Sequence, residues 1–421
     1  MPPADVVITG VGVVSPIGIG KEQAWDSFCA GRSGIRRLSL RDASASPIRI
    51  GGEVRDFDPR AQSVPRKSLK VMARDSQFGV AASILACEDA AIGPGGLDPE
   101  RFGVILGADR ICSSLEHSEP PYRACMVDGH FDFGRWGSEG MAVTFPLSFL
   151  RVLPNMIASH ISIVHDARGP NNTIHHAEVS SLLAVSEAAQ VIQRGMADVM
   201  IAGGASSQTN PYDWIRHAGY GRLSPRDDDP AAAMRPFDAD RSGEVRGEGA
   251  AAFILESRRH AAARGAAMLA RVVSWAAAFE PRADQPLAGA AIRRAMRLAL
   301  DRAGLLPQSV GHVNAHGLST REDDAVEARA IRDVLGDAPV TAPKSYFGNL
   351  GAAAGAVEMV ASVLAMSGGP VPATLNYCCP DPACPVRVIA GEPLAGGVAT
   401  SVLLNWTPLG QAAAVVLAGP D

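Results

Sequence analysis

Residues 6–12 read Val-Val-Ile-Thr-Gly-Val-Gly, a β-branched run that ends in two glycines. β-branched residues favour strands, and an uninterrupted apolar run is typical of a strand that is buried on both faces. Glycines directly after such a run indicate a tight turn. The sequence therefore predicts a buried strand close to the N-terminus.

Similar strands alternate with helical patterns along residues 1–249. Alternating helices and strands are predicted at 75–92, 102–107, 179–195 and 197–204. Residues from about 110 to 150 break the pattern and are rich in Gly, aromatic residues and His. A long irregular stretch of this kind usually serves function or oligomer contacts, so we expect an insertion there. Residues 221–249 are turn-rich and charged, which favours a surface crossing between two halves.

The same alternation starts again at residue 250. Strands are predicted at 250–255, 268–277, 310–315 and 338–342, with helices at 286–304, 323–335 and 351–367. Residues 397–404 and 411–418 are typical of an antiparallel pair. Strands that alternate with helices predict an α/β fold of parallel sheets covered on both faces. Two rounds of alternation indicate duplicated βαβ halves, 1–249 and 250–421, although the sequence carries no clear internal repeat.

Composition excludes several classes of function. The 421 residues are 47% hydrophobic and 20% charged, which is enough to bury a large core. A net charge of −5 provides no basic field for nucleic acid. Apolar stretches are much shorter than the roughly 20 residues that span a bilayer, and the N-terminus lacks a basic signal-peptide region. Seven irregularly spaced cysteines indicate free thiols in a reducing cytoplasm.

Several separated motifs occur in a characteristic order. They are residues 6–18, Leu153-Pro154-Asn155-Met156, Gly169-Pro170-Asn171-Asn172-Thr173, residues 197–204, Phe237-Asp238 with Arg241, Gly247-Glu248-Gly249, Asn314-Ala315-His316-Gly317, Lys344-Ser345 and Gly355-Ala356-Val357-Glu358. In order and spacing the chain resembles the β-ketoacyl-carrier-protein synthases of the type II, chain-elongating class from end to end. The resemblance implies a thiolase fold, a five-layer αβαβα sandwich that is usually a dimer, with the active site between the halves.

Members of that family elongate acyl chains by decarboxylative condensation on a cysteine. Their cysteine lies a few residues after Gly-Pro-Asn, and Glu178 stands at that position here without any gap. The nearest cysteines along the chain are Cys125 and Cys378, so no small shift of the alignment restores the thiol. Acyl transfer to a carboxylate would give a mixed anhydride that is quickly hydrolysed, whereas a thiolate is a good nucleophile and leaving group. The substitution therefore argues against ordinary elongation.

The other family site residues are partly retained. The resemblance assigns His316 as the first of two histidines that stabilise the enolate, while Asn349 replaces the second. Lys344 keeps the position of a lysine found beside the site, and Thr320 and Asn405 fall on the substrate-binding side. Residues 403–408, Leu-Leu-Asn-Trp-Thr-Pro, replace the glycine-rich loop that gates acyl entry. We therefore expect a Glu-His-Asn site in place of Cys-His-His.

Four interpretations remain open. The first is a non-elongating partner subunit, similar to a chain-length factor, beside an active Cys-containing ketosynthase. The second is an enzyme of altered chemistry on carrier-bound acyl groups, such as malonyl decarboxylation, acyl transfer or cyclisation, with Glu178 as acid or base. The third is a metal site of His176, Glu178 and His316, although adjacent His175 and His176 are not expected to face one site in extended backbone. The fourth is elongation without cysteine.

Acyl carrier protein is the partner that the resemblance implies, with either a homodimer or a heterodimer with a Cys-containing ketosynthase. Lys67, Lys70 and Arg226 match basic positions that would attract an acidic carrier. Cys378, Cys379 and Cys384 cluster in a Pro-rich segment, but their spacing fits no zinc pattern. The sequence predicts no cofactor and no metal.

Overall fold

The chain forms two sheets of the same topology, joined edge to edge. The computed structural model describes residues 5–39, 46, 48–281, 287–396 and 399–420. The first sheet has the order β8–β5–β9–β10–β1, and the second has the order β13–β12–β15–β16–β11, with β14 beside β13. If the strands of each half are numbered along the chain, without β14, both orders are 3-2-4-5-1. This shared order establishes the duplication predicted from the sequence.

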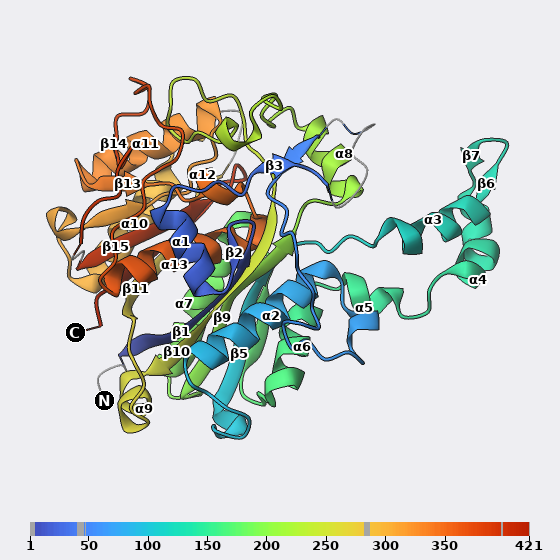
Figure 1. Cartoon of the computed structure of the whole chain (residues 1–421), viewed down its shortest axis with the longest axis horizontal. Helices are drawn as coiled ribbons and strands as arrows, with labels where there is room; N and C mark the ends of the chain where they lie inside the picture. Colours follow the sequence, from blue (N-terminus) through green and yellow to red (C-terminus); the bar gives the residue numbers. More distant parts are fainter. Residues whose placement is uncertain (1–4, 40–45, 47, 282–286, 397–398, 421) are drawn as a thin grey trace.

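The strands of the first sheet are β1 (Val6–Ser15), β5 (Phe102–Ala108), β8 (Asn171–Ile174), β9 (Val199–Ser207) and β10 (Glu248–Ser257). Those of the second are β11 (Ala270–Phe279), β12 (His312–Asn314), β13 (Pro339–Thr341), β14 (Arg387–Val388), β15 (Thr400–Trp406) and β16 (Gln411–Ala418). The two sheets join where Val6 to Ile8 of β1 pair with Ala270 to Val272 of β11. The sheets therefore form one continuous path (Figure 1).

The sheets are mixed, so the expectation of parallel sheets holds only for some of the strand pairs. In the first half β10 runs antiparallel to both β9 and β1, and in the second half β16 runs antiparallel to both β15 and β11. A tight turn after β15 leads directly into β16, and two strands joined by a short turn must be antiparallel. The predicted antiparallel pair at the C-terminus is confirmed for β15 and β16, although residues 397–398 lie outside the described part of the chain.

The predicted boundary between the halves also needs correction. The segment 250–255 was expected to begin the second half, but it belongs to β10, which pairs along its length with β9 and β1 of the first sheet. The halves therefore divide between β10 and β11, after Ser257 and not after residue 249. A strand pattern alone does not show which sheet the strand joins, because pairing partners come from distant segments.

Alternating side chains of two strands separate the layers. In β10, Ala251, Phe253 and Leu255 pack into a central cluster, whereas Ala250, Ala252 and Ile254 pack into an outer one. In β16, Ala413, Val415 and Leu417 face the central cluster, and the alternate residues face a third cluster. Successive side chains of a strand point to opposite faces, so each sheet separates two helical layers. The result is the expected five-layer αβαβα sandwich.

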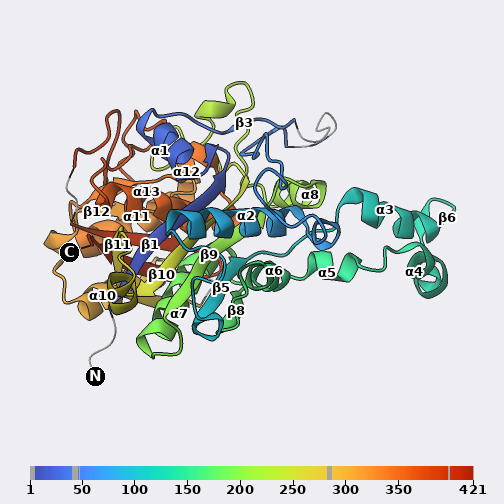
Figure 2. The same ribbon diagram turned by 60° about the horizontal axis from the view of Figure 1, so that its bottom comes forward.

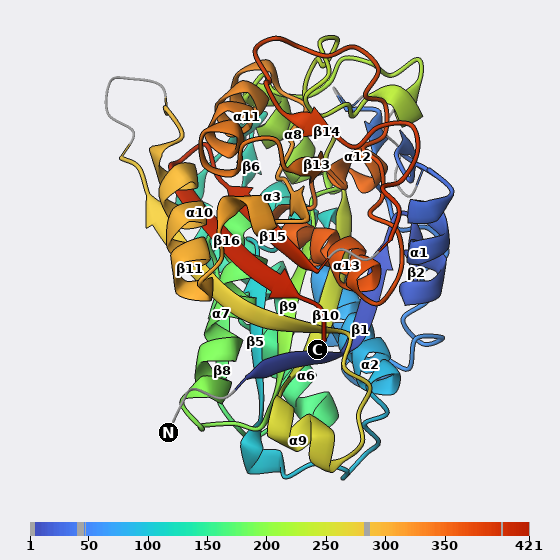
Figure 3. The same cartoon turned by 90° about the vertical axis from the view of Figure 1, so that its left-hand side faces the viewer.

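Helices fill these layers as their residue patterns predict. The central layer holds α7 (Ser180–Gln193) and α13 (Ala354–Met366), and every residue of α13 except Leu364 is buried. A helix that is buried all round needs neighbours on all sides, as a central layer provides. The outer layers hold α2 (Arg74–Asp89) and α6 (Met156–His165) on the first sheet and α10 (Ala290–Ala303) and α11 (Arg321–Leu335) on the second. Figure 3 shows the C-terminal half from its own side.

Five predicted helices correspond to α2, α7, α10, α11 and α13, although residue 286 lies outside the described part. The shorter helices and strands of the body are β2 (Gly18–Ile19), α1 (Lys21–Cys29), β3 (Arg36–Arg37), β4 (Ile50–Gly51), α8 (Pro211–Gly219), α9 (Arg258–Ala263) and the fully buried α12 (Lys344–Phe347).

The irregular stretch after β5 forms an arm that projects from the body (Figures 1 and 2). Its elements are α3 (Leu115–Ala124), β6 (Met126–Val127), β7 (His130–Phe131), α4 (Met141–Val143) and α5 (Ser148–Val152). The arm exposes several large apolar side chains, among them Phe133 at 75% and Phe149 at 65%. Large exposed apolar surfaces on a protein usually mark interaction sites.

Candidate functional site

A strand–turn–helix segment presents Glu178. Strand β8 ends at Ile174, Ala177 has a φ of 47°, and one 3₁₀ turn leads into α7. Positive φ is uncommon for a residue with a side chain, and such strained positions cluster at functional sites. Strands β5 and β9 approach this helix start through glycines: a Cβ on Gly107 would lie 2.6 Å from the Ser181 nitrogen, and a Cβ on Gly204 would lie 2.9 Å from the Ser181 Cβ. The start of α7, two residues after Glu178, therefore packs closely against the strands.

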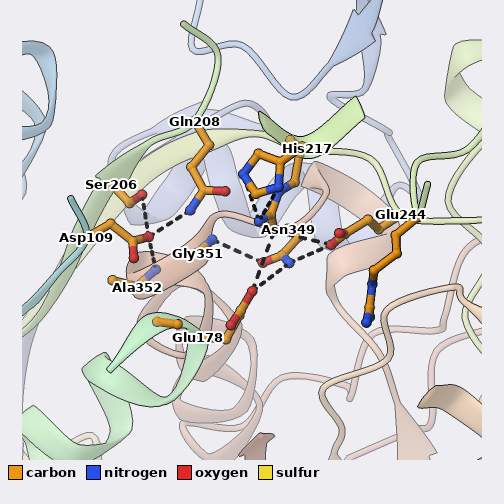
Figure 4. Close-up of polar contacts among 12 residues, drawn as sticks. Asp109, Glu178, Ser206, Gln208, His217, Glu244, Asn349, Gly351 and Ala352 are labelled. Carbon is orange, nitrogen blue, oxygen red and sulfur yellow. Dashed lines mark hydrogen bonds and ion pairs between the residues drawn. The ribbon is translucent and has the colours of Figure 1, made fainter. Parts of the chain in front are cut away.

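Two donors hold the carboxylate of Glu178. Its Oε1 lies 3.5 Å from Nη1 of Arg246 and accepts a hydrogen bond of 3.3 Å from Nδ2 of Asn349. Asn349 Oδ1 in turn accepts from the backbone nitrogen of Gly351 at 3.0 Å, which fixes the orientation of the amide (Figure 4). Glu178 is only 9% exposed, so these contacts face little competition from water.

A second carboxylate shares the same two donors. Glu244 Oε2 lies 3.2 Å from Nη1 of Arg246 and accepts from Nδ2 of Asn349 at 2.8 Å. The guanidinium of Arg246 also lies 3.0 Å from the ring of His217, whose pKa is lowered to about 2 by burial and by the neighbouring arginines. His217 therefore stays neutral, and Arg246 is the cation between two acids. We call Glu178, Glu244, Arg246, Asn349 and His217 the ionic cluster.

The ionic cluster borders a cavity of about 710 Å³. Asp109, Arg110, His175, His176, Ala177, Gln208, Arg216, Tyr220, Arg222, Leu318, Thr407, Pro408, Leu409 and Gln411 complete its lining. Asp109 is tied into the wall, because its Oδ2 accepts from Ser206, Gln208 and the Ala352 nitrogen (Figure 4). The cavity is thus rich in charged groups that are already paired.

His316 lies in a separate buried group. Its Nδ1 accepts from Lys344 Nζ at 2.9 Å and faces Asn405 Nδ2 at 3.1 Å, while Lys344 is ion-paired with Glu358. Burial and the nearby charges of Lys344, Arg222 and Arg246 hold the pKa of His316 well below its usual value. The neutral ring accepts at Nδ1, so it carries its proton on Nε2, which has no hydrogen-bond partner among the described residues.

The expected Glu-His-Asn site is therefore assembled only in part. Glu178 and Asn349 meet as predicted, but His316 is fully buried and is not part of the cavity lining. Lys344 lies beside His316, as the family resemblance implies. Asn405, which was expected on the substrate-binding side, also lies beside His316; it is fully buried and lines neither this cavity nor the one that adjoins it. We find no hydrogen bond between His316 and Glu178 within the described ranges. The spacing of residues along the sequence does not show that His316 lies in a different group from Glu178 and Asn349.

The remaining predicted binding residues lie apart from the ionic cluster. Lys67 and Lys70 are exposed, and Arg226 donates to the carbonyl of Asp240 at 3.2 Å. None of these three is part of the cavity lining. Thr320 precedes α11 and lines an adjoining cavity of about 480 Å³, whose wall shares Arg222 and Pro408 with the first. Their role in carrier binding stays a prediction.

Sequence reasoning missed Arg246, which is ion-paired with Glu178, and Glu244, which shares the two donors of Glu178. The segment 221–249 was predicted to cross the surface, yet Glu244 and Arg246 are 6% and 7% exposed. Charged residues in a turn-rich segment usually face water, and only their mutual pairing makes burial possible. The signal that could have found them is the position of Glu244 and Arg246 immediately before the Gly247-Glu248-Gly249 motif.

The two adjacent histidines and the predicted metal alternative also change in the structure. His175 and His176 both line the cavity, which contradicts the expectation that only one faces the site. The chain bends at His176, where φ is −136° and ψ is 47°, so the backbone is not extended there. His176, Glu178 and His316 do not form a metal-binding group in the part of the chain that the structure describes.

Two protein-family models match the chain. The model of the β-ketoacyl synthase N-terminal domain matches residues 4–261, and that of the C-terminal domain matches residues 269–378. The chain belongs to the β-ketoacyl synthase family. The family models, like the strand pairing, divide the chain between β10 and β11.

Three similar proteins place this β-ketoacyl synthase relative more narrowly. The 3-oxoacyl-[acyl-carrier-protein] synthase 2 of Synechocystis sp. is 35% identical over 92% of the chain and 91% of its own length. The ishigamide ketosynthase/chain length factor structure has a TM-score of 0.87 and 29% identity, covering 100% of both chains. A type II polyketide synthase acyl-carrier protein in complex with its ketosynthase bound to the hexaketide gives a TM-score of 0.83 and 29% identity, over 99% of this chain and 100% of that one. The chain is therefore a ketosynthase-family protein of fatty acid or polyketide biosynthesis.

Among the described helices of this β-ketoacyl synthase relative, none combines the length and apolar character needed to cross a membrane.

Proposed function

We propose that the chain is a non-elongating, chain-length-factor-like subunit that pairs with a Cys-containing ketosynthase. One observation supports this most strongly: the residue at the nucleophile position, Glu178, is a carboxylate held by Arg246 and Asn349. Ion pairing and hydrogen bonding both stabilise the anion, and they make it a still weaker nucleophile. A stable acyl-enzyme on this residue is not expected.

The shape of the molecule supports a partner chain. Strand β8 is the last strand of the sheet, and its outer edge pairs with no other strand in the described ranges. Its first two residues, Asn171 and Asn172, are exposed. An open edge is able to pair with a strand of a second chain, and the arm adds exposed apolar side chains such as Phe133 and Phe149. These features favour a heterodimer with a ketosynthase or a homodimer, and the missing thiol favours the heterodimer.

The family relationship supports an acyl carrier protein as a further partner, and the free cysteines support the compartment. A carrier protein complex is known for the structural relative described above, and we propose that an acyl carrier protein delivers the acyl group to the assembled pair. Seven free cysteines are present among the described residues, which is consistent with a reducing cytoplasm. We propose that the chain acts there.

A second candidate is catalysis on carrier-bound acyl groups with Glu178 as acid or base. It is favoured by the cavity, whose lining includes the carboxylates of Glu178 and Glu244, and by the Nε2–H of His316, which has no hydrogen-bond partner in the part of the chain that the structure describes. Malonyl decarboxylation is the least favoured version. It would bring a third carboxylate beside Glu178 and Glu244, which already share Arg246, while the other arginines of the lining, Arg110, Arg216 and Arg222, are paired with Asp213 and Asp323.

The decisive experiment compares the isolated chain with the co-expressed pair. The isolated chain is offered malonyl-carrier protein while carbon dioxide release and acyl products are followed, and the assay is repeated with Glu178→Ala and His316→Ala. We expect no turnover alone and chain elongation only with a Cys-containing ketosynthase. Turnover by the isolated wild type that both variants abolish would support the second candidate and refute the subunit proposal.

A further inference from the structure

Two adjacent cysteines lie side by side on the surface, away from the ionic cluster. Cys378 and Cys379 are both exposed, and their sulfur atoms are 3.6 Å apart. They occupy the Pro-rich segment between α13 and β14, where the sequence showed a cysteine cluster whose spacing fits no zinc pattern. Neither residue lines the described cavities that border Glu178 or Thr320.

The backbone that carries these thiols is firmly anchored. Asn376 donates from Nδ2 to the carbonyls of Ala231 and Met234, both at 2.9 Å. The nitrogens of Cys378 and Cys379 each donate to Asp238 Oδ2 at 2.8 Å. The two thiols are therefore presented by a fixed loop and do not need to be ordered when a ligand binds.

Asp238 adds a third potential ligand to the two sulfurs. One carboxylate oxygen and the two Sγ atoms all lie within 4.8 Å of one another, the one such group among the residues that the structure describes. Asp238 is fully buried; its Oδ1 accepts from the Asp240 nitrogen at 2.9 Å and lies 3.8 Å from Nη1 of Arg235. A carboxylate oxygen has lone pairs for more than one partner. The loop thus holds a soft and a hard type of ligand together.

The sulfur separation fits a tetrahedral ion. Zinc–sulfur bonds are about 2.3 Å long, so two thiolates on one tetrahedral zinc lie roughly 3.8 Å apart. The observed 3.6 Å is close to this value without any movement of the loop.

We propose that Cys378, Cys379 and Asp238 bind a thiophilic divalent cation of the zinc class. The two thiols lose their protons to solvent when the ion binds, and the exposed side of the site leaves the fourth ligand position to water. The spacing of the cysteines alone predicted no metal, because the third ligand comes from Asp238, 140 residues away from Cys378 along the chain.

Binding would tie this loop to the segment that adjoins the second cavity. Asp381 of the loop accepts from Arg241 Nη1 at 2.6 Å, and Arg241 Nε donates to the Thr320 carbonyl at 3.0 Å. Thr320 lines that second cavity, of about 480 Å³. The ion would thereby stabilise one wall of that cavity, and this role does not depend on the proposed function.

The test uses the full, reduced chain with Zn²⁺ as the probe, in competition with a chromophoric chelator, and Co²⁺ to report thiolate ligation by its charge-transfer absorption. We expect one bound ion and a thiolate band in the wild type. Cys378→Ser and Cys379→Ser should each weaken binding by about tenfold or more and reduce the band. Both cysteines are exposed, so these variants should fold normally.

Cys29→Ser is the matched control, because Cys29 is also an exposed cysteine but belongs to no metal-binding group in the described part of the chain. It should bind Zn²⁺ like the wild type. Asp238→Asn should weaken binding with the thiolate band retained, provided that its circular dichroism is unchanged. Equal affinity of the wild type and the Cys378→Ser, Cys379→Ser double variant would overturn the proposal, as would a Co²⁺ complex without thiolate absorption.

Discussion

The carboxylate of Glu178 lies 3.5 Å from the guanidinium of Arg246, at the position where the family's elongating members carry a reactive thiol. Arg246 is buried and serves Glu244 as well, so one cation balances two acids. Removing one member of a buried ion pair strongly destabilises the fold, because the remaining charge is left without water or a counter-ion. The charges at Glu178 therefore balance one another within the site, and their contribution to the free energy of unfolding can be measured.

Replacement of Arg246 by Leu should destabilise the chain strongly. It leaves Glu178 and Glu244 buried together without their cation, and we expect a loss of about 3–5 kcal/mol in the free energy of unfolding. Glu178→Gln should cost only about 1 kcal/mol, since Glu244 still pairs with Arg246 and the new amide is able to accept a hydrogen bond. Urea unfolding measures both values.

Arg297→Leu serves as the control for loss of an arginine, because Arg297 is exposed on α10. Its effect should stay within about 0.5 kcal/mol. If Arg246→Leu is as mild as this control, the ionic cluster does not stabilise the fold.

Introducing the missing thiol should not by itself create a synthase. Glu178→Cys leaves Asn349 in place of the second histidine and leaves Arg246 with one carboxylate fewer. We expect no two-carbon elongation above background with acyl- and malonyl-carrier substrates, and the acylated form is followed by mass spectrometry. Efficient elongation by this single variant would show that the rest of the site is already complete for condensation.

Acid should weaken the contribution of His312 to stability. His312 is fully buried in β12, and burial lowers its pKa to about 3, below the ordinary value of 6.5. A base with a depressed pKa stabilises the folded state above pH 6.5, and this stability is lost as the pH falls toward 3, because only the unfolded chain takes up the proton. Relative to His312→Asn, the wild type should lose about 1.4 kcal/mol between pH 7.5 and 5.5. A constant difference in denaturant unfolding would contradict the buried neutral ring.

The arm should contribute to partner binding and not to the stability of the isolated chain. Phe133→Ser with Phe149→Ser removes two exposed aromatic side chains, so the melting temperature should barely change. Affinity for the co-expressed ketosynthase should fall by about tenfold or more, since such apolar residues often dominate binding energy. Leu306→Ser is the control, because Leu306 is 71% exposed but lies in the C-terminal half. Equal affinities of the arm variant and the control would exclude the arm from the interface.

Carrier binding should depend on Lys67 and Lys70 if these residues attract an acidic partner. Lys67→Glu with Lys70→Glu reverses two exposed charges and should slow association, with a larger effect at low salt. Arg297→Glu with Arg329→Glu makes the same change in net charge on exposed positions of α10 and α11 and should have little effect. Surface plasmon resonance at two ionic strengths distinguishes the pair. Parallel losses in both variants would indicate a general charge effect.

Local sequence patterns were sufficient for much of the fold. The runs that became β1, β5 and β9 are continuous and apolar, and helices such as α7 and α11 carry the periodicity expected of them. The position of Glu178 also followed from the order of the motifs, because the segments on either side of it identify the place where the family carries its nucleophile. These features depend on residues that are close together in the sequence, so they can be predicted from the sequence alone.

Tertiary structure alone decided which groups meet. Asn349 contacts Glu178 from 171 residues away, and β10 joins the first sheet although its pattern equally suits the second. The burial of Arg246 is possible only because two acids from different segments converge on it. His316 lies in a different buried group from Glu178 for the same reason. Pairing energies of this kind arise between distant segments, and no local pattern in the sequence carries them.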